Sequence, residues 1–382
     1  MATVQALATT LAYTAGTWKT NTVDLLQNPV LPEVCYIFLE DGDFYKKKCT
    51  ESGRRKILGP FDAPDFLSNQ LCTDLNGYFG SKSSFNAKEL VGVSTWFRCL
   101  VKRVLKPREG KARDGKNYLW YEMGFFTRWS HPNGCRVLCI GTPEELRMQL
   151  EVVLRKSPSL ELRDPFVMLR PLLDQIIKLY DDSTWRMRDE VRAIEENRLK
   201  QMPDFVAMHE ISRHTGHVVE VEAVAIETIE NLFHRQKTTY ESLSTPLDKT
   251  YQEQAREYLS FQLQMMKSLK WRSLSNQERL NAEITLAYNM IASQDNTVIK
   301  SIAVLTMTFL PATFISALFS TTFFSYGEGK WKFSSQFWIY WVVVVLTTLL
   351  VLLIWWRWLG GSFRNAKSPS WKQCGKQKKS IV

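Results

Sequence analysis

The sequence has few of the patterns that mark an enzyme or a metal-binding protein. It shows no Ser/His/Asp order, no phosphate-binding loop and no paired-cysteine site, and its seven cysteines are scattered along the chain. His209, His214 and His217 share one predicted helix, but no two of them have the spacing of four that a zinc-protease helix requires. We therefore expect solvated or interhelical histidines, reduced thiols in a cytosolic domain, no cofactor and no enzyme activity.

Two C-terminal stretches lack charge almost entirely. Phe337 to Trp356 contains no charged residue, and Val298 to Phe324 contains only Lys300. Each reaches the ~20 apolar residues that cross a bilayer, and aromatic residues flank the second stretch as they do at membrane interfaces. A pair of buried core helices is the alternative. The missing charge favours two membrane-spanning helices.

Basic residues are distributed unevenly around these two spans. The loop between them carries Lys330, Lys332 and Glu328. The segment after the second span carries seven basic residues, namely Arg357, Arg364, Lys367, Lys372, Lys376, Lys378 and Lys379. Because positive flanks stay in the cytosol, we expect a multi-pass protein with both termini cytosolic.

The net charge of +10 does not by itself indicate a nucleic-acid partner. Much of the excess lies beside the second span, where it sets topology and attracts anionic lipid, and the chain shows no recognition helix or zinc-finger spacing. We expect the lipid bilayer as a partner and no nucleic acid. The first residues resemble neither a cleaved signal nor a mitochondrial presequence, which favours the plasma membrane.

The N-terminal part has the pattern of a mixed α/β domain. Short runs rich in Val, Phe, Tyr and Trp predict strands at Val34 to Leu39, Leu90 to Leu105, Tyr118 to Arg128 and Cys135 to Ile140. Thr142 and Pro143 predict the start of a helix that ends near Lys156. Residues 106–117 mix Gly, Pro and both charge signs, which predicts a solvated loop; a basic phosphate patch is the alternative.

Helical periodicity dominates after Asp164. Breaks at Met202-Pro203 and Thr245-Pro246 divide this part into helices, and no proline or glycine occurs from Asp248 to Pro311. A single helix can therefore run from Asp248 through the first span. Residues 181–200 alternate in charge sign, which is typical of an exposed, salt-bridged helix.

The first span carries one polar stripe. At about 100° per residue, seven side chains fall within one arc, namely Ile299, Ile302, Thr306, Leu310, Thr313, Ala317 and Ser320. Asp295 lies on the same arc and Asn296 lies close by. Either several copies meet along this stripe to form a pore, or small and hydroxyl side chains simply let membrane helices approach closely. Periodicity alone does not choose between them.

The same residues resemble the CorA-type magnesium transporter family, in particular its divergent fungal members. The resemblance lies in Asp295 to Lys300 (DNTVIK), Phe309 to Ile315 (FLPATFI), the second span and the basic tail, with Arg279 to Ile284 (RLNAEI) and Tyr288-Asn289 similar to the family's stalk helix. It implies a homopentamer whose pore is lined by the first span, including Asn296, Ile299, Ile302, Leu310 and Thr313, with the second spans outside.

One departure from the family lies at its Gly-Met-Asn signature, where this chain has Ser320-Thr321-Thr322. Thr322 would offer a ring of hydroxyl dipoles in place of the asparagine. The resemblance implies a passive divalent-cation channel, with Mg²⁺ as the transported and the regulatory ion and with Asp295, Asn296, Thr313 and Thr322 along the cation path. The alternative is a non-conducting scaffold or sensor of the same architecture.

The expected fold class is an α+β cytosolic domain followed by long, coiled-coil-like stalk helices and two C-terminal transmembrane helices. The expected parts are a cytosolic α/β domain at 1–160, a helical stalk region at 161–297, a pore-lining transmembrane helix at 298–324, an outer loop at 325–336, a second transmembrane helix at 337–359 and a basic cytosolic tail at 360–382.

Overall fold

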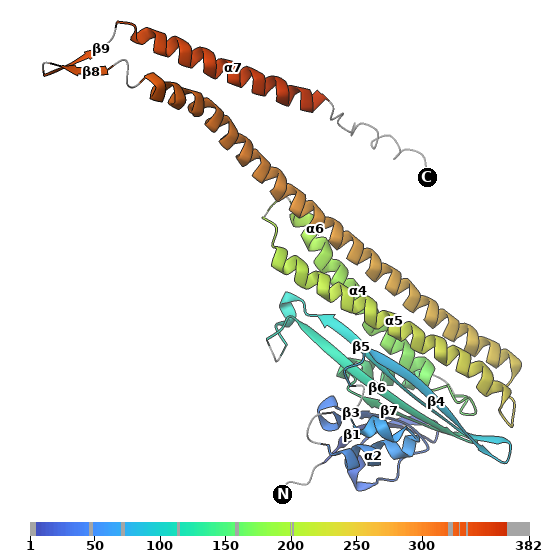
Figure 1. Cartoon of the computed structure of the whole chain (residues 1–382). Helices are drawn as coiled ribbons and strands as arrows, with labels where there is room; N and C mark the ends of the chain where they lie inside the picture. The colour runs from blue at the N-terminus through green and yellow to red at the C-terminus, as the bar shows by residue number, and fades with distance from the viewer. Residues whose placement is uncertain are drawn as a thin grey trace. The chain divides into compact units, whose positions relative to one another are not determined.

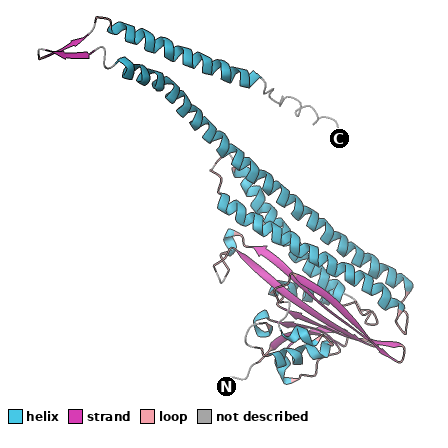
Figure 2. Cartoon of the chain, viewed as in Figure 1, coloured by secondary structure: helices cyan, strands magenta, loops and turns pink. Residues whose placement is uncertain are grey.

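The structure is a computed structural model that describes residues 5–45, 49–69, 73–112, 115–156, 160–198, 200, 202–319, 324–327, 329–333 and 335–364. The chain divides into two units, Met1–Thr285 and Leu286–Val382. Figure 1 labels the elements and Figure 2 shows the sheet and helices by type. The family-like architecture expected from the sequence, an α/β part, long helices and two apolar C-terminal helices, is confirmed.

The first unit contains a seven-stranded sheet with the order β2-β1-β3-β7-β6-β5-β4. The β3–β7 pair is parallel and all other pairs are antiparallel. The strands are β1 (Leu7–Thr14), β2 (Thr17–Asp24), β3 (Val34–Leu39), β4 (Gly77–Asn86), β5 (Glu89–Val104), β6 (Tyr118–Ser130) and β7 (Gly134–Ile140).

Four long helices complete this unit together with shorter turns. The helices are α3 (Glu144–Lys156), α4 (Leu169–Asn197), α5 (Phe205–Glu241) and the first part of α6 (Lys249–Phe319). The shorter elements are η1 (Leu25–Gln27), α1 (Asp41–Phe44), α2 (Glu51–Leu58), η2 (Gly59–Phe61), η3 (Asp65–Asn69) and η4 (Pro107–Glu109). Figure 1 shows α4 and α5 lying side by side along the sheet, with α6 next to them.

Alternation along the central strand β3 places a hydrophobic core on each face of the sheet. Tyr36 and Phe38 belong to the core shared with α3, α4, α5 and α6, whereas Ile37 and Leu39 belong to the core shared with α2. Every residue of β3 is buried because both faces are covered. One face of the sheet and the long helices of the first unit therefore share one continuous core.

The strands expected at β3, β5, β6 and β7 are present within one or two residues of the predicted bounds, and so is α3. No sequence pattern predicted β1, β2 or β4. β1 and β2 meet in a two-residue hairpin turn in which Ala15 and Gly16 both have positive φ, at 49° and 78°. This mirror-image turn suits the twist of paired strands.

The five cysteines that the structure describes, Cys35, Cys49, Cys99, Cys135 and Cys139, are all free thiols and all buried. Burial raises the pKa of each, to about 12 for Cys35 and Cys99. They are therefore protonated small apolar groups of the core rather than reactive thiolates.

Candidate functional site

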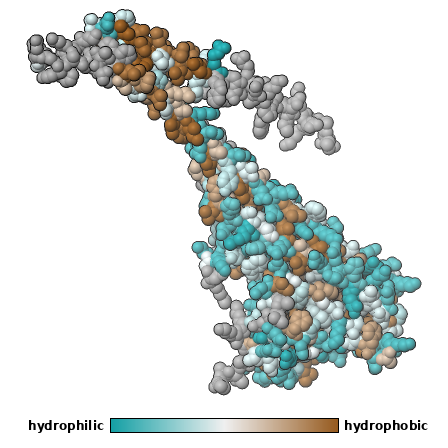
Figure 3. Space-filling view, in the orientation of Figure 1, coloured by the Kyte–Doolittle hydropathy of each residue, from teal (hydrophilic) through white to brown (hydrophobic). Residues whose placement is uncertain are grey.

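The second unit contains the C-terminal part of α6 and the helix α7 (Phe337–Arg364). Both helices are long and apolar enough to cross a membrane, and only 6% of each apolar window is buried. Figure 3 shows hydrophobic residues covering this part of α6 and α7. A water-soluble helix would bury such a surface, so lipid or further protein must cover it.

Helix α7 packs against one face of α6. Ile315 on α6 and Val344 on α7 are only 6% and 8% exposed. The hydroxyl oxygens of Ser316 and Tyr340 lie 2.5 Å apart across the same contact. At about 100° per residue, Ile315 lies about 180° from the middle of the predicted stripe. The stripe thus faces away from α7.

The described members of the stripe are all exposed. Ile299, Ile302 and Leu310 are 61%, 58% and 62% exposed, and Asp295, Asn296, Thr306, Thr313 and Ala317 are in the exposed class as well. Ser320 and Thr322, also predicted on the cation path, lie outside the described residues. The structure therefore brings eight predicted residues onto one uncovered side of one helix.

The two threonines on the stripe use their hydroxyl protons within the helix. Thr306 donates to the carbonyl of Ile302 at 2.9 Å, and Thr313 lies 3.0 Å from the carbonyls of Phe309 and Leu310. With the proton so engaged, the lone pairs of each hydroxyl oxygen face outward. Such oxygens can accept hydrogen bonds from the water shell of a cation.

Pro311 lies inside α6 between these threonines. Proline has no N–H, so the carbonyl of Met307 lacks its helical donor at this level. This missing backbone hydrogen bond affects a single turn of α6, next to Leu310, where the stripe is apolar. The first span therefore lacks a backbone hydrogen bond next to the apolar constriction predicted at Leu310.

The segment between the two helices forms a short hairpin, β8 (Phe324–Gly327) paired with β9 (Lys330–Phe333). The sequence predicted only a polar loop here. Gly329 has a φ of 73°, a conformation that favours glycine, and this supports the reversal of the chain.

Histidines of α5 do not form a metal site. His214 packs edge-on against Tyr118 of β6 with ring centroids 4.8 Å apart, and His217 Nδ1 lies 3.0 Å from Lys102 Nζ. The expectation of solvated or interhelical histidines is thus wrong for His214 and His217, because both contact side chains of the sheet. Among the described residues no group of three or more His, Cys, Asp or Glu side chains is placed to hold a metal ion.

Lys102 of β5 is enclosed by aromatic rings rather than by carboxylates. Its Nζ lies 4.4 Å from the Tyr118 ring centroid and 4.9 Å from that of Trp120. Burial lowers the pKa of Lys102 to about 8, and burial lowers the pKa of His214 to about 4, with a further contribution from the Lys102 charge. The cluster is a desolvated cation held by ring faces.

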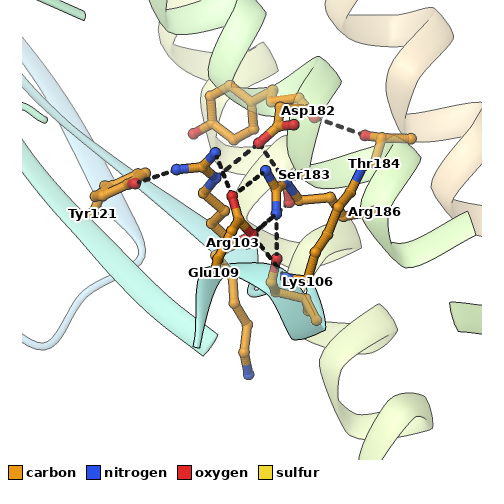
Figure 4. Close-up of polar contacts among 11 residues, drawn as sticks. Arg103, Lys106, Glu109, Tyr121, Asp182, Ser183, Thr184 and Arg186 are labelled. Carbon is orange, nitrogen blue, oxygen red and sulfur yellow. Dashed lines mark hydrogen bonds and ion pairs between the residues drawn. The ribbon is translucent and has the colours of Figure 1, made fainter. Parts of the chain in front are cut away.

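A second charged cluster ties the β5–β6 connection to α4 (Figure 4). Arg186 donates to both oxygens of Glu109, at 2.5 and 3.0 Å, and its Nε donates to Asp182 at 2.7 Å. Arg103 of β5 donates to the same two carboxylates. The loop predicted at 106–117 is therefore not simply solvated, because Glu109 binds Arg186 of α4. The charged segment predicted at 181–200 is salt-bridged, but it is not fully exposed, because Arg186 is only 7% exposed.

The site and fold together define a membrane protein of the two-span type with a large α/β and helical part before the spans. The sequence profile described as "CorA-like Mg2+ transporter protein" matches residues 144–357. This covers more than half of the chain, which therefore belongs to the CorA-like family.

Solved structures of low sequence identity share the fold. Full-length CmaX aligns with a TM-score of 0.60 and 13% identity, covering 92% of this chain and 97% of that one. The CorA magnesium transporter from Methanocaldococcus jannaschii aligns with a TM-score of 0.58 and 13% identity, covering 91% and 96%.

One relative comes from a fungus. The "Notoamide biosynthesis cluster protein M'" of Aspergillus versicolor is 28% identical over 272 residues, which is 61% of this chain and 58% of that protein. The chain thus spans somewhat more than half the length of this relative.

Proposed function

We propose that this protein is a CorA-like transporter of divalent cations, Mg²⁺ in particular, which pass down their electrochemical gradient through a pore between five copies. The observation that supports it most is the position of the stripe from Asp295 to Ala317, exposed on the side of α6 that faces away from α7. The carboxylate, amide and hydroxyl groups of the stripe thus face away from α7, as groups that line a pore between copies would.

The length of the stripe fits a transmembrane path. From Asp295 to Thr313 the helix rises about 27 Å at 1.5 Å per residue, close to the ~30 Å of a bilayer's hydrocarbon core. In an assembly of copies, Asp295 would form a carboxylate ring at the inner mouth, Ile302 and Leu310 would form apolar constrictions, and Thr313 would form a hydroxyl ring deeper in.

The chemistry of the stripe suits a hard cation. Its polar groups are carboxylate, amide and hydroxyl oxygens, and it contains no histidine or cysteine for a softer metal. An inside-negative potential contributes about 2.3 kcal/mol per charge per 100 mV, so a divalent ion needs no other energy source. Binding of the same cation on the cytosolic side would close the pore.

Ion flux into proteoliposomes tests the proposal. The purified full-length protein is reconstituted with an inside-negative potential, and Mg²⁺ entry is compared with that of Co²⁺ and Zn²⁺. Thr313→Leu should abolish flux because it replaces the hydroxyl ring by an apolar one, whereas Thr313→Ser should retain it. Equal flux through Thr313→Leu would remove Thr313 from the path, and absence of all flux from a pentameric preparation would contradict transport.

A non-conducting scaffold of the same architecture is the second candidate, favoured by Ser320-Thr321-Thr322 at the position of the family's Gly-Met-Asn signature. A triple substitution that places glycine, methionine and asparagine at 320, 321 and 322 separates the two functions. Flux in the wild-type chain supports the transporter, and flux only in the restored variant supports the scaffold.

A further inference from the structure

A carboxyl group is buried where α4, α5 and α6 meet in the first unit. Glu222 of α5 is 0% exposed. Its Oε1 lies 2.7 Å from Thr184 Oγ1 of α4 and 3.0 Å from Ser273 Oγ of α6. Thr184 and Ser273 are themselves buried. The three helices are thus linked at one point by a single carboxyl oxygen.

The junction offers too few hydrogen-bond donors for an ionised carboxylate. Thr184 has one hydroxyl proton but two acceptors, the carbonyl of Tyr180 at 2.9 Å and Glu222 Oε1 at 2.7 Å. The other carboxyl oxygen, Glu222 Oε2, has no hydrogen-bond partner among the described residues. A buried carboxylate needs donors on both oxygens, so the ionised form would be left with an unsatisfied charge.

A protonated carboxyl satisfies the same distances. Glu222 then donates to Thr184 Oγ1, Thr184 donates to the Tyr180 carbonyl, and Ser273 donates to Glu222 Oε1. Each of the three protons has one acceptor. Oε2 still has no donor among the described residues, but it then carries no charge, so the geometry of the junction favours a neutral carboxylic acid over a carboxylate.

The surrounding groups do little to favour the charged form. On α4, the Tyr180 hydroxyl donates to the carbonyl of Leu100 at 2.9 Å and so is not aimed at the carboxyl group. On α6, Lys270 is the charged group that favours ionisation of Glu222. Burial outweighs the hydrogen bonds and Lys270, and raises the pKa of Glu222 to about 7.

We propose that Glu222 is a proton-sensing residue: the α4–α5–α6 junction is closed when Glu222 is protonated and loosens when it ionises. The sign follows from linkage. A carboxyl group whose pKa is raised in the folded state stabilises that state fully below its unfolded pKa, and this contribution is lost as pH rises toward and through the folded value. A rise in cytosolic pH around neutrality is therefore the change to which the junction responds. The inference does not depend on the proposed ion path.

Hydrogen exchange of the full-length protein in nanodiscs tests this. Peptides containing Glu222 and Ser273 are followed at pH 6 and pH 8, with rates corrected for intrinsic exchange. With pKa values of 4.5 unfolded and about 7 folded, linkage gives about a tenfold loss of protection between these pH values in the wild-type chain. Glu222→Gln, which is neutral at both, should show no such loss.

A matched control is Glu227→Gln, which removes an exposed carboxyl group from the same helix and should keep the wild-type pH response. An equal response in Glu222→Gln and wild type would overturn the proposal, as would a wild-type response of less than about twofold.

Infrared titration provides a second readout that does not require Glu222→Gln to fold. The wild-type protein should show the carbonyl absorption of a protonated carboxyl group that disappears with a midpoint near pH 7. Ser273→Ala removes a donor to the carboxyl group and should move this midpoint upward. A midpoint below pH 5.5, or one that Ser273→Ala leaves in place, would contradict the assignment.

Discussion

The hydroxyl oxygens of Ser316 on α6 and Tyr340 on α7 lie 2.5 Å apart and connect the two apolar helices of the second unit. Hydrogen bonds between membrane helices contribute modestly, because the separated helices also find partners. We expect Ser316→Ala and Tyr340→Phe to couple by about 0.6 kcal/mol in a double-mutant cycle of unfolding in detergent. Thr347→Ala is the control, since Thr347 donates within α7 to Val343 and should not couple to Ser316.

Asp295→Asn should lower Mg²⁺ flux several-fold at low ionic strength and by less at high salt. The reason is that a carboxylate ring raises the local cation concentration at a pore mouth, and salt screens this effect. Glu278→Gln removes an exposed carboxyl group on the same helix away from the spans and should change flux little. A loss that is equal at low and high salt would indicate a structural role for Asp295.

Glu109→Gln should destabilise the protein at pH 7 and destabilise it progressively less as pH falls below 4.5. Hydrogen bonds from Arg186 and the Lys106 backbone lower the pKa of Glu109 to about 2. A lowered carboxyl pKa contributes stability above the unfolded value of 4.5, which is lost as pH falls toward 2. Because the side chain is 33% exposed, water screens these contacts, and the expected loss of stability is about 1–2 kcal/mol at pH 7.

Thermal unfolding of the full-length protein at pH 7 and pH 3.5 measures this change. Glu196→Gln serves as the control, because its partner Arg192 is an exposed neighbour on the same helix and such pairs contribute little. A deficit in Glu109→Gln that persists unchanged at pH 3.5 would indicate lost packing instead of lost charge.

Lys102→Met should flatten the alkaline part of the stability profile. The folded pKa of Lys102, about 8, lies below the ordinary 10.5, so the wild-type chain gains stability as pH rises from 8 to 10.5, when the ammonium group deprotonates. The methionine variant lacks this rise. The comparison uses thermal unfolding from pH 7 to 10.5, and parallel profiles for both chains would show that Lys102 keeps its full charge in the fold.

Much of the architecture follows from local sequence. β3 could be predicted because it is an unbroken run of apolar side chains, which suits a strand that is buried on both faces. The helix α5 begins where Asp204 accepts a hydrogen bond from the Ala207 amide at 3.0 Å, as a helix-capping residue does. The unbroken run to Pro311 likewise predicted that α6 would extend into the first span. These signals act within a few residues of where they are read.

The parts that could not be predicted depend on distant partners. The strand β2 reads as polar because it is an edge strand with one face in water. Glu109 looked like a loop residue, yet its environment is set by Arg186, 77 residues away. The stripe could be located by periodicity, but its position opposite α7 becomes visible only when both helices are placed.

The burial of Cys35, Cys49, Cys99, Cys135 and Cys139 leaves these thiols protonated and out of reach of water-borne reagents. With Cys72 and Cys374 replaced by serine, a membrane-impermeant thiol reagent should therefore label the remaining native cysteines very little. Single cysteines introduced along the stripe would then report, residue by residue, which side chains water can reach from either side of the bilayer. The native core is in this way already suited to mapping an aqueous path by chemical labelling.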